Sequence, residues 1–312
     1  MLANEGLSRD ILRLIIWFPF RLITQVLPVR WGIFLLQMLG DIHYGLSRGR
    51  KRLLAENISR ITSHRIDGKK EILAIREYFR NHYIDHLLIF LFPRFGNREI
   101  ERFVEIEGIE DLNMALKGGR GVILVHGHFG PVHLPLVVLG RLGYNMMQIG
   151  LPSDEGLSWI GKKVAFRLRL KYEAKMPAVI IKADTFLRPV FKWLRENCVI
   201  MITGDGSGTD RRFGRHREFS FLGQRVIFPL GPAILADKTE APIIPMFIIP
   251  GSRKPYKIII ERPLTSDRVG EEKILHITDQ FINRLENYVQ ICPGFMHFLD
   301  RFSPGALIME ER

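Results

Sequence analysis

The sequence predicts an α/β fold with a mixed, mostly parallel central sheet flanked by helices, preceded by a helical amino-terminal portion. Two observations support this fold class. After about residue 100, short β-rich runs alternate with helical stretches, a pattern that favours a mostly parallel sheet with helices on both faces. Before that point the chain has helical patterning only. We therefore expect residues 1–100 to form a helical region and residues 101–312 an α/β domain, packed as one unit.

Composition excludes two protein classes. A hydrophobic content of 46% is too high for a disordered chain, and 25% charged residues leave no room for several membrane spans of about 20 apolar residues each. The two cysteines, Cys198 and Cys292, are too few for a disulfide framework or a four-cysteine zinc site. A net charge of +12 favours either nucleic acid or an anionic membrane surface as partner.

The amino-terminal segment favours the membrane. Residues 11–40 are strongly apolar but are interrupted by Arg13, Arg21 and Arg30. Arginines spaced through Leu, Ile, Trp and Phe are typical of an interfacial helix, whose apolar face enters the lipid while the guanidinium groups reach the phosphates. A helix buried against the domain and a single tilted span are the alternatives. Nucleic acid is not expected, because the basic residues accompany aliphatic runs instead of spaced aromatic side chains that stack on bases.

The rest of the amino-terminal portion also has helical patterning. Pro19 and Pro28 are expected to kink or divide the apolar segment. A basic stretch at residues 47–65 would face phosphate headgroups, an acidic partner or solvent. Apolar residues at spacings of three and four predict a helix over residues 69–92, which Pro93 closes.

The second region contains predicted strands and helices in alternation. Short β-rich runs predict strands at residues 122–125, 178–181, 199–203, 243–249 and 256–261. Between and after them, helices are expected at residues 131–142, 157–170, 185–196, 230–239 and 270–290.

Three histidines follow the first of these strands. His126, His128 and His133 stand within eight residues, and Gly127 and Gly130 permit a tight turn between them. Functional groups in parallel sheets collect where strands end and helices begin. We therefore expect a functional site at this turn, in which the imidazoles of His128 and His133 could face each other.

Two chemistries fit such a histidine cluster. Metal binding is one, because His-x-His followed by another His resembles a zinc ligand set. The pattern departs from dinuclear hydrolases of the metallo-β-lactamase type, however: Gly130 stands where their aspartate would be, and His133 falls too late. We expect no metal, and keep a metal-dependent hydrolase using His126, His128 and His133 as an alternative. The other chemistry is acid–base catalysis, in which one imidazole takes a proton from a hydroxyl while a partner fixes its tautomer.

The stretch GVILVHGHFGPVH resembles the signature of the lipid A biosynthesis acyltransferases, the lauroyl and myristoyl transferase family that acylates lipopolysaccharide precursors. Its members carry a strand followed by His-Phe-Gly-Asn-Trp-Glu, an instance of the His-x4-acid motif of glycerolipid acyltransferases. Further landmarks occur in the family's order along nearly the whole chain. They are Phe79-Arg-Asn81, the strand that ends at Asp205, Phe221-Leu-Gly223, residues 239–245 and residues 292–297.

The resemblance implies a glycerolipid acyltransferase-like fold and an O-acyltransferase that needs no cofactor. The expected reaction moves a fatty acyl chain from an acyl thioester, on acyl carrier protein or coenzyme A, to a hydroxyl of a lipid A precursor or a related bacterial phospholipid or glycolipid. The expected location is the cytoplasmic face of the bacterial inner membrane, with monotopic attachment or a single amino-terminal anchor.

One residue departs from the family motif, because His133 stands where the family has glutamate. The resemblance implies that His128 is the general base. A neutral His133 could accept a hydrogen bond from His128, but it supplies no negative charge to stabilise an imidazolium. Asp205 is our candidate for the missing carboxylate. A catalytically inactive, lipid-binding member of the same fold stays open as an alternative.

Basic side chains near these residues are candidates for substrate binding, because guanidinium groups bind phosphate through paired hydrogen bonds and attract acidic carrier proteins. One group lies in the segment after Asp205, where a solvated loop is the alternative, and another in a predicted helix where the family carries a site arginine. The full set of expected substrate contacts is His126, Arg167, Arg169, Arg211, Arg212 and Arg215.

Overall fold

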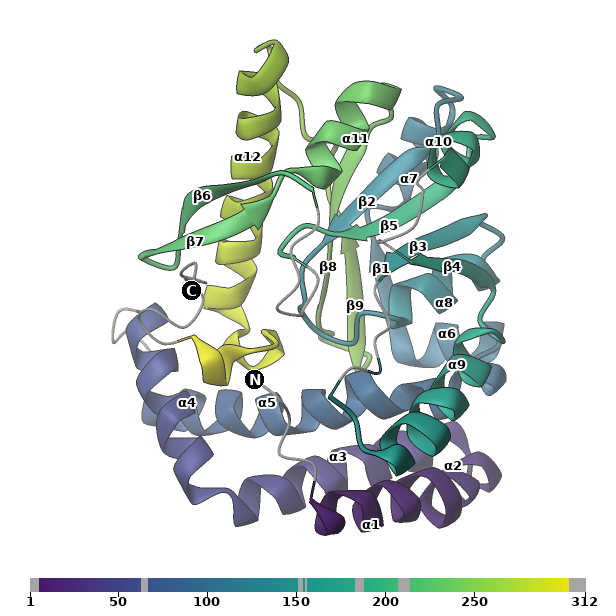
Figure 1. The fold of residues 1–312 in the computed structure, drawn as a ribbon, viewed down its shortest axis with the longest axis vertical. Helices are drawn as coiled ribbons and strands as arrows, with labels where there is room; N and C mark the ends of the chain where they lie inside the picture. Colours follow the sequence, from purple (N-terminus) through teal and green to yellow (C-terminus); the bar gives the residue numbers. More distant parts are fainter. Residues whose placement is uncertain are drawn as a thin grey trace.

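The computed structural model describes residues 6–62, 67–150, 154, 156–182, 188–206 and 214–302. It confirms the predicted fold class. A seven-stranded sheet has the order β1-β9-β8-β2-β5-β3-β4, in which every neighbouring pair is parallel except β8 and β9 (Figure 1). The strands are β1 Val104–Glu107, β2 Val122–His126, β3 Met146–Gly150, β4 Ala178–Lys182, β5 Val199–Thr203, β8 Ile243–Pro250 and β9 Tyr256–Ile260; β6 His216–Phe221 and β7 Gln224–Pro229 form a separate antiparallel hairpin.

Strand β2 lies in the middle of the sheet between β5 and β8. All five of its residues are buried, which accounts for its unbroken apolar sequence, since both faces of a parallel sheet are covered by helices. Its last residue, His126, pairs in register with Thr203 at the end of β5. The segments that follow β2 and β5 therefore leave the sheet side by side.

Helices cover the sheet and account for the predicted alternation. They are α6 Asn97–Phe103, α7 Ile109–Leu116, α8 Leu134–Arg141, α9 Arg167–Glu173, α10 Arg188–Arg195, α11 Gly231–Thr239 and α12 Gly270–Ile291. Several expected boundaries differ. The helix predicted over residues 69–92 ends at Leu87, and two 3₁₀ turns follow it at Leu88–Phe90 and Phe92–Arg94. The helix predicted from residue 131 begins at Leu134, because residues 131–133 still belong to the turn after β2, and the helix predicted over 157–170 contains a π-helical stretch at Gly161–Phe166 and extends to Glu173.

The amino-terminal portion consists of helices packed on one end of the sheet. In Figure 1 they lie below the sheet, with α5 next to it and α1, α2 and α3 farther away. Pro28 separates α2 from α3, and Pro19 lies inside a π-helical turn, as expected of residues that interrupt a helix. The elements are α1 Leu7–Ile15, the π-helical turn Ile16–Phe20, α2 Arg21–Val26, α3 Val29–Leu46, α4 Arg48–Ile61 and α5 Gly68–Leu87.

Buried contacts join these helices to the sheet. Leu54 of α4 and Phe79 of α5 share one hydrophobic cluster with Ile123 of β2 and Phe247 of β8. Within the helical layer, the carboxylate of Asp41 accepts hydrogen bonds of 2.7–2.8 Å from the guanidinium groups of two α5 residues, Arg76 and Arg80.

The outer helices carry an apolar surface. Among the described residues, no helix combines the length and the apolar character that crossing a membrane requires. Of the three arginines in the apolar segment, Arg13 pairs with Asp10 at 3.1 Å and Arg21 lies over the Tyr172 ring, whereas Arg30 is exposed. Most exposed large apolar side chains of the described chain belong to α1, α2, α3 and the π-helical turn between α1 and α2; they are Leu7, Ile11, Leu12, Ile15, Phe18, Leu22, Ile23, Val26, Trp31, Phe34, Met38, Ile42 and Leu46.

Candidate active site

The candidate site is built on the turn between β2 and α8. His128 lies in this turn, and His133 is the residue immediately before α8. Gly130 has φ +69°, and a Cβ atom there would lie 2.9 Å from the carbonyl oxygen of Ile248. Only glycine combines that backbone conformation with so close an approach, so the turn depends on the glycine at this position.

The turn brings His128 to Asp205, which follows the neighbouring strand β5. The Nδ1 atom of His128 lies 2.8 Å from Oδ1 of Asp205, and the backbone N–H of His128 donates to Oδ2 at 2.6 Å. A carboxylate only accepts hydrogen bonds, so Nδ1 carries the proton and the neutral imidazole keeps its free electron pair on Nε2. The side chains are 18% and 19% exposed respectively, so the pair is partly buried. This arrangement can accept a proton from a substrate hydroxyl.

His128 and Asp205 shift each other's pKa values. Burial works to lower the pKa of His128, but the charge of Asp205 and its hydrogen bond raise it above the ordinary histidine value. For Asp205, burial works to raise the pKa, whereas His128 lowers it to a net value below the ordinary one. Asp205 is therefore ionised at neutral pH, and an imidazolium formed at His128 is stabilised.

Two glycines let the pair approach. A Cβ atom on Gly127 would lie 3.1 Å from Oδ2 of Asp205 and 2.9 Å from a methyl group of Leu285. At Gly204, just before Asp205, a Cβ atom would meet the Phe281 ring at 2.4 Å. Both positions need a residue without a side chain because Leu285 and Phe281 of α12 pack against the ends of β2 and β5 here.

His133 does not contact His128 in the way we expected. Within the described parts of the chain, no hydrogen bond joins the two imidazoles. Instead, His133 has Arg169, Asp85 and Glu173 as charged neighbours; burial and then Arg169 lower its pKa, so it is neutral at physiological pH. Among the described contacts, the group that orients His128 is Asp205. A catalytic role of His133 stays a prediction.

His126 is the last residue of β2 and is only 3% exposed. Its Nδ1 lies 3.0 Å from the carbonyl oxygen of Gly127, while its Nε2 is buried without a hydrogen-bond partner among the described residues. Burial lowers the pKa of His126 to about 4, so the side chain is neutral. Its role as a substrate contact stays a prediction.

The predicted arginines are distributed over several elements. Arg167 and Arg169 belong to α9, and Arg169 donates to the buried carboxylate of Glu173 at 2.7 Å. Arg215, next to the hairpin, forms an exposed ion pair with Glu271 at 2.7 Å. Arg211 and Arg212 lie outside the described residues. Of the three arginines that the structure describes, Arg169 is connected to the histidine cluster through its electrostatic effect on His133.

Sequence reasoning missed two residues of this site. Asp85 of α5 accepts a hydrogen bond from the backbone N–H of Val132 at 3.0 Å, and its Oδ2 lies 3.9 Å from Nδ1 of His297. His297, near the carboxyl terminus, donates Nε2–H to the carbonyl oxygen of Gly130 at 2.8 Å. A signal for Asp85 was available, because it stands seven residues after Tyr78 on the apolar face of the predicted helix, where a carboxylate needs a partner.

The candidate metal ligands do not form a cluster. Among the described residues, no group of three or more His, Cys, Asp or Glu side chains is arranged to hold a metal ion. The closely spaced histidines are instead separated by the turn, with His126 inside the sheet, His128 at Asp205 and His133 at the start of α8.

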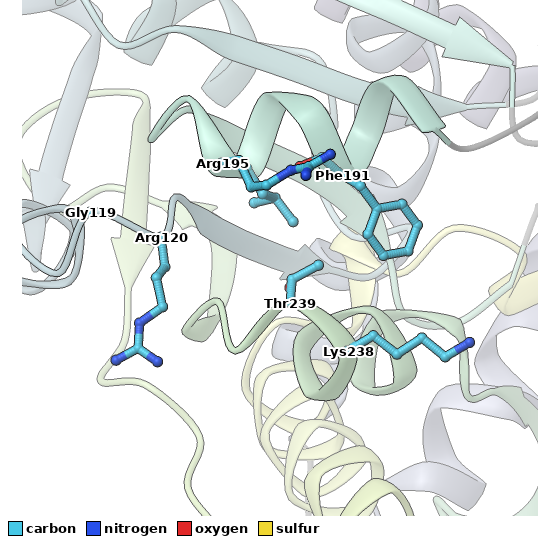
Figure 2. A pocket seen from close by; sticks show the side chains of 7 residues that line it. Gly119, Arg120, Phe191, Arg195, Lys238 and Thr239 are labelled. Atoms are coloured by element: carbon cyan, nitrogen blue, oxygen red, sulfur yellow. The ribbon is translucent and has the colours of Figure 1, made fainter.

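A cavity of about 440 Å³ lies at the other end of the sheet (Figure 2). Its lining residues precede β2 or belong to α10 and the end of α11. The cavity therefore adjoins the amino end of β2, whereas His128 follows the carboxyl end of that strand. Its polar side chains include Arg120, Arg195 and Lys238, with no histidine or carboxylate among its lining residues. The cavity therefore lacks a proton acceptor for hydroxyl activation.

Comparison with known proteins assigns the family. No individually curated protein gave a significant match to the chain. The sequence model described as bacterial lipid A biosynthesis acyltransferase matches residues 8–303, which include every helix and strand except the first residue of α1. The chain therefore belongs to the bacterial lipid A biosynthesis acyltransferase family.

Proposed function

We propose that the protein transfers a fatty acyl chain from an acyl thioester, carried by acyl carrier protein or coenzyme A, to a hydroxyl of a lipid A precursor. Family membership supports an acyltransferase role in lipid A biosynthesis. The observation that carries the proposal further is the hydrogen-bonded pair of His128 and Asp205, which leaves Nε2 of His128 free to act as a base.

The proposed reaction proceeds by addition and elimination. Nε2 of His128 removes the proton of the acceptor hydroxyl while the oxygen attacks the thioester carbonyl carbon. The tetrahedral intermediate then collapses, the carbon–sulfur bond breaks, and the imidazolium returns its proton to the leaving thiolate. The products are the new ester and the free thiol of the carrier, with His128 restored as the neutral base.

Asp205 is proposed to orient His128 rather than to take the proton itself. Its two oxygens engage the backbone N–H and Nδ1 of the same residue, and such a double contact fixes both the ring orientation and the tautomer. The negative charge also stabilises the imidazolium that forms in the transition state. Positively charged side chains on α9 and beside the hairpin, Arg167, Arg169 and Arg215, are proposed to bind phosphate groups of the substrates.

We also infer monotopic attachment to the cytoplasmic face of the bacterial inner membrane. The concentration of exposed large apolar side chains on α1, α2 and α3 supports this location, since apolar surface of this kind marks sites that contact a membrane or a partner. The same helical layer contains α5, which contacts the turn that carries His128 through Asp85 and Val132. The helical layer that carries the exposed apolar side chains is therefore also the layer that contacts the turn of His128.

The test is an acyl-transfer assay with the full-length protein purified in detergent. Radiolabelled lauroyl and myristoyl thioesters of acyl carrier protein and coenzyme A are offered with a panel of lipid A precursors and phospholipids, with and without chelator. The proposal expects chelator-resistant acylation of a lipid hydroxyl that disappears in His128→Ala. Equal inactivity of the wild type and His128→Ala across the panel supports the lipid-binding alternative instead, and loss of activity with chelator alone supports the metal-dependent one.

A further inference from the structure

The turn that carries His128 is fixed from a second side by residues of α5 and the carboxyl-terminal segment. Oδ1 of Asp85 accepts the backbone N–H of Val132 at 3.0 Å. At the other end of the turn, the backbone N–H of His297 donates to the carbonyl oxygen of His128 at 2.9 Å. The Nε2–H of the His297 ring donates to the carbonyl oxygen of Gly130 at 2.8 Å. Groups that lie outside β2, β5 and α8 thus form hydrogen bonds with three residues of the turn, His128, Gly130 and Val132.

Asp85 is the only side chain in this arrangement that carries a full negative charge, and it is 11% exposed. Its Oδ2 lies 3.5 Å from Nδ1 of His86 and 3.9 Å from Nδ1 of His297. Burial works to raise the pKa of Asp85, but its interactions with His297, His86, His133 and Arg169 lower the pKa to about 2. Of these four neighbours, Arg169 is the one that stays charged at neutral pH. The carboxylate is therefore ionised throughout the physiological range.

The charge of Asp85 also acts on the base. The ionisable groups that influence His128 are Asp205 after β5 and Asp85 on α5, which raise its pKa, while the neighbouring His126 and His297 are neutral because burial lowers their own pKa values. His128 is accordingly influenced by two carboxylates, one bonded to it directly and one acting across the turn.

We propose that Asp85 is a positioning residue of this enzyme, whose carboxylate fixes the turn at Val132 and provides a second negative charge for the imidazolium of His128. The inference rests on the proposed function. It differs from the expectation that the side chain at position 133 supports His128. Among the described contacts, the Asp85 side chain forms a hydrogen bond with the backbone of the turn, and the His133 side chain forms none.

The test uses the full-length protein in detergent and two substitutions of Asp85. Asp85→Asn keeps an oxygen that can accept the Val132 N–H but removes the charge, whereas Asp85→Ala removes both. Glu77→Gln is the matched control, because Glu77 lies on the same helix and packs against the same carboxyl-terminal segment at Gly294. His128→Ala serves as the reference for loss of the base.

Two measurements are made on each variant. The first is kcat and KM for transfer from labelled acyl carrier protein to the lipid A precursor, with the pH dependence of kcat/KM. The second is the pKa of His128 from NMR titration of histidine-labelled protein, with the His128 signal assigned by its absence in His128→Ala. Thermal unfolding of every variant separates loss of the site from loss of the fold.

The proposal expects kcat of Asp85→Asn to fall by about tenfold or more while KM stays within about threefold, because the lost charge acts on the transition state. The acidic limb of kcat/KM and the NMR-derived pKa of His128 should both move down by about half a pH unit or more, since a nearby negative charge favours the imidazolium. Asp85→Ala should lose more activity, and Glu77→Gln should match the wild type in both measurements.

If Asp85→Asn has the kcat of the wild type and an unchanged His128 pKa, this inference is overturned. The proposed function survives that result if His128→Ala is inactive in the same assay. If the wild type is as inert as His128→Ala, the proposed function fails. The NMR titration then still decides the role of Asp85, because an unchanged pKa contradicts it and a lowered pKa supports it without any turnover.

Discussion

The imidazole of His128 and the carboxylate of Asp205 are joined by a 2.8 Å hydrogen bond although 77 residues separate them in the chain. The parallel pairing of β2 with β5 produces this contact, since it ends both strands at the same edge of the sheet. A second hydrogen bond, from the backbone N–H of His128 to the same carboxylate, fixes the turn as well as the ring. Orientation of the base is therefore built into the central strands of the fold.

Asp205→Asn should lower kcat by about a hundredfold or more, with a small effect on KM. The amide can donate a hydrogen bond to Nδ1, which selects the tautomer whose proton sits on Nε2, where the electron pair is needed. Steady-state kinetics of acyl transfer measure the effect. A loss smaller than about threefold would contradict the orienting role of Asp205.

The pH dependence of kcat/KM should show an acidic limb above the ordinary histidine pKa of 6.5, because Asp205 raises the pKa of His128. The base works only when unprotonated, so activity should rise with pH through that limb and fall away below it. Removing the charge in Asp205→Asn should move the limb to lower pH. A profile that is flat from about pH 5.5 to 8 is inconsistent with His128 as the base.

Gly127→Ala should abolish most activity, because its Cβ atom would approach Oδ2 of Asp205 to 3.1 Å and displace the carboxylate or the Leu285 side chain. Gly231→Ala is the matched control, since a Cβ atom there, at the start of α11, meets no atom within 4 Å. Activity and thermal unfolding are measured for both. Equal activity of the two variants would show that the close approach at Gly127 is unimportant.

His133→Ala should reduce kcat by less than about tenfold, a smaller effect than that of Asp205→Asn, because no described hydrogen bond links His133 to the base. The two variants are compared in the same assay at one pH. If His133→Ala is as inactive as His128→Ala, the original expectation of a direct partnership between the two imidazoles is correct and Asp205 alone does not orient the base.

Asp41→Asn should lower the free energy of unfolding by about 1–2 kcal/mol, at the low end for charge-assisted hydrogen bonds because Arg76 is 44% exposed to solvent. Arg76 and Arg80 hold the pKa of Asp41 well below its ordinary value. The contribution is therefore complete above the unfolded-state pKa of about 4 and is lost as pH falls below it. Denaturant unfolding at neutral and acidic pH tests this, and a difference that grows on acidification would contradict it.

The sequence alone predicted the strands on either side of the site well. The runs at residues 122–125 and 199–203 are uninterrupted by charged residues and rich in Val and Ile, each has a glycine at one end, and they correspond to β2 and β5. Asp205 was a candidate partner for His128 because it follows a predicted strand at the place where the resembled family has an aspartate. By contrast, glutamates alternate with Val104 and Ile106 in the four residues of β1, and β3 reads Met-Met-Gln-Ile-Gly with a single β-branched residue, so neither is a continuous run of β-branched residues.

The parts of the site that sequence patterns did not predict depend on packing between distant elements. Asp85 reaches Val132 only because α5 lies against the sheet, and His297 reaches Gly130 only because the carboxyl-terminal segment lies beside the turn. The position of His133 was mispredicted for a local reason. The helix begins at Leu134 instead of residue 131, so His133 ends the turn and has Arg169 and Asp85 as its charged neighbours.

A double-mutant cycle tests whether His128 and Asp205 act as one unit in acyl transfer. The rate of acyl transfer is measured for the wild type, His128→Ala, Asp205→Ala and the double variant. Because Asp205 acts through His128, the double variant should be no slower than His128→Ala, within about threefold. Losses that multiply in the double variant would show that the two residues act independently, and a His128→Ala variant as active as the wild type would show that His128 is not the base.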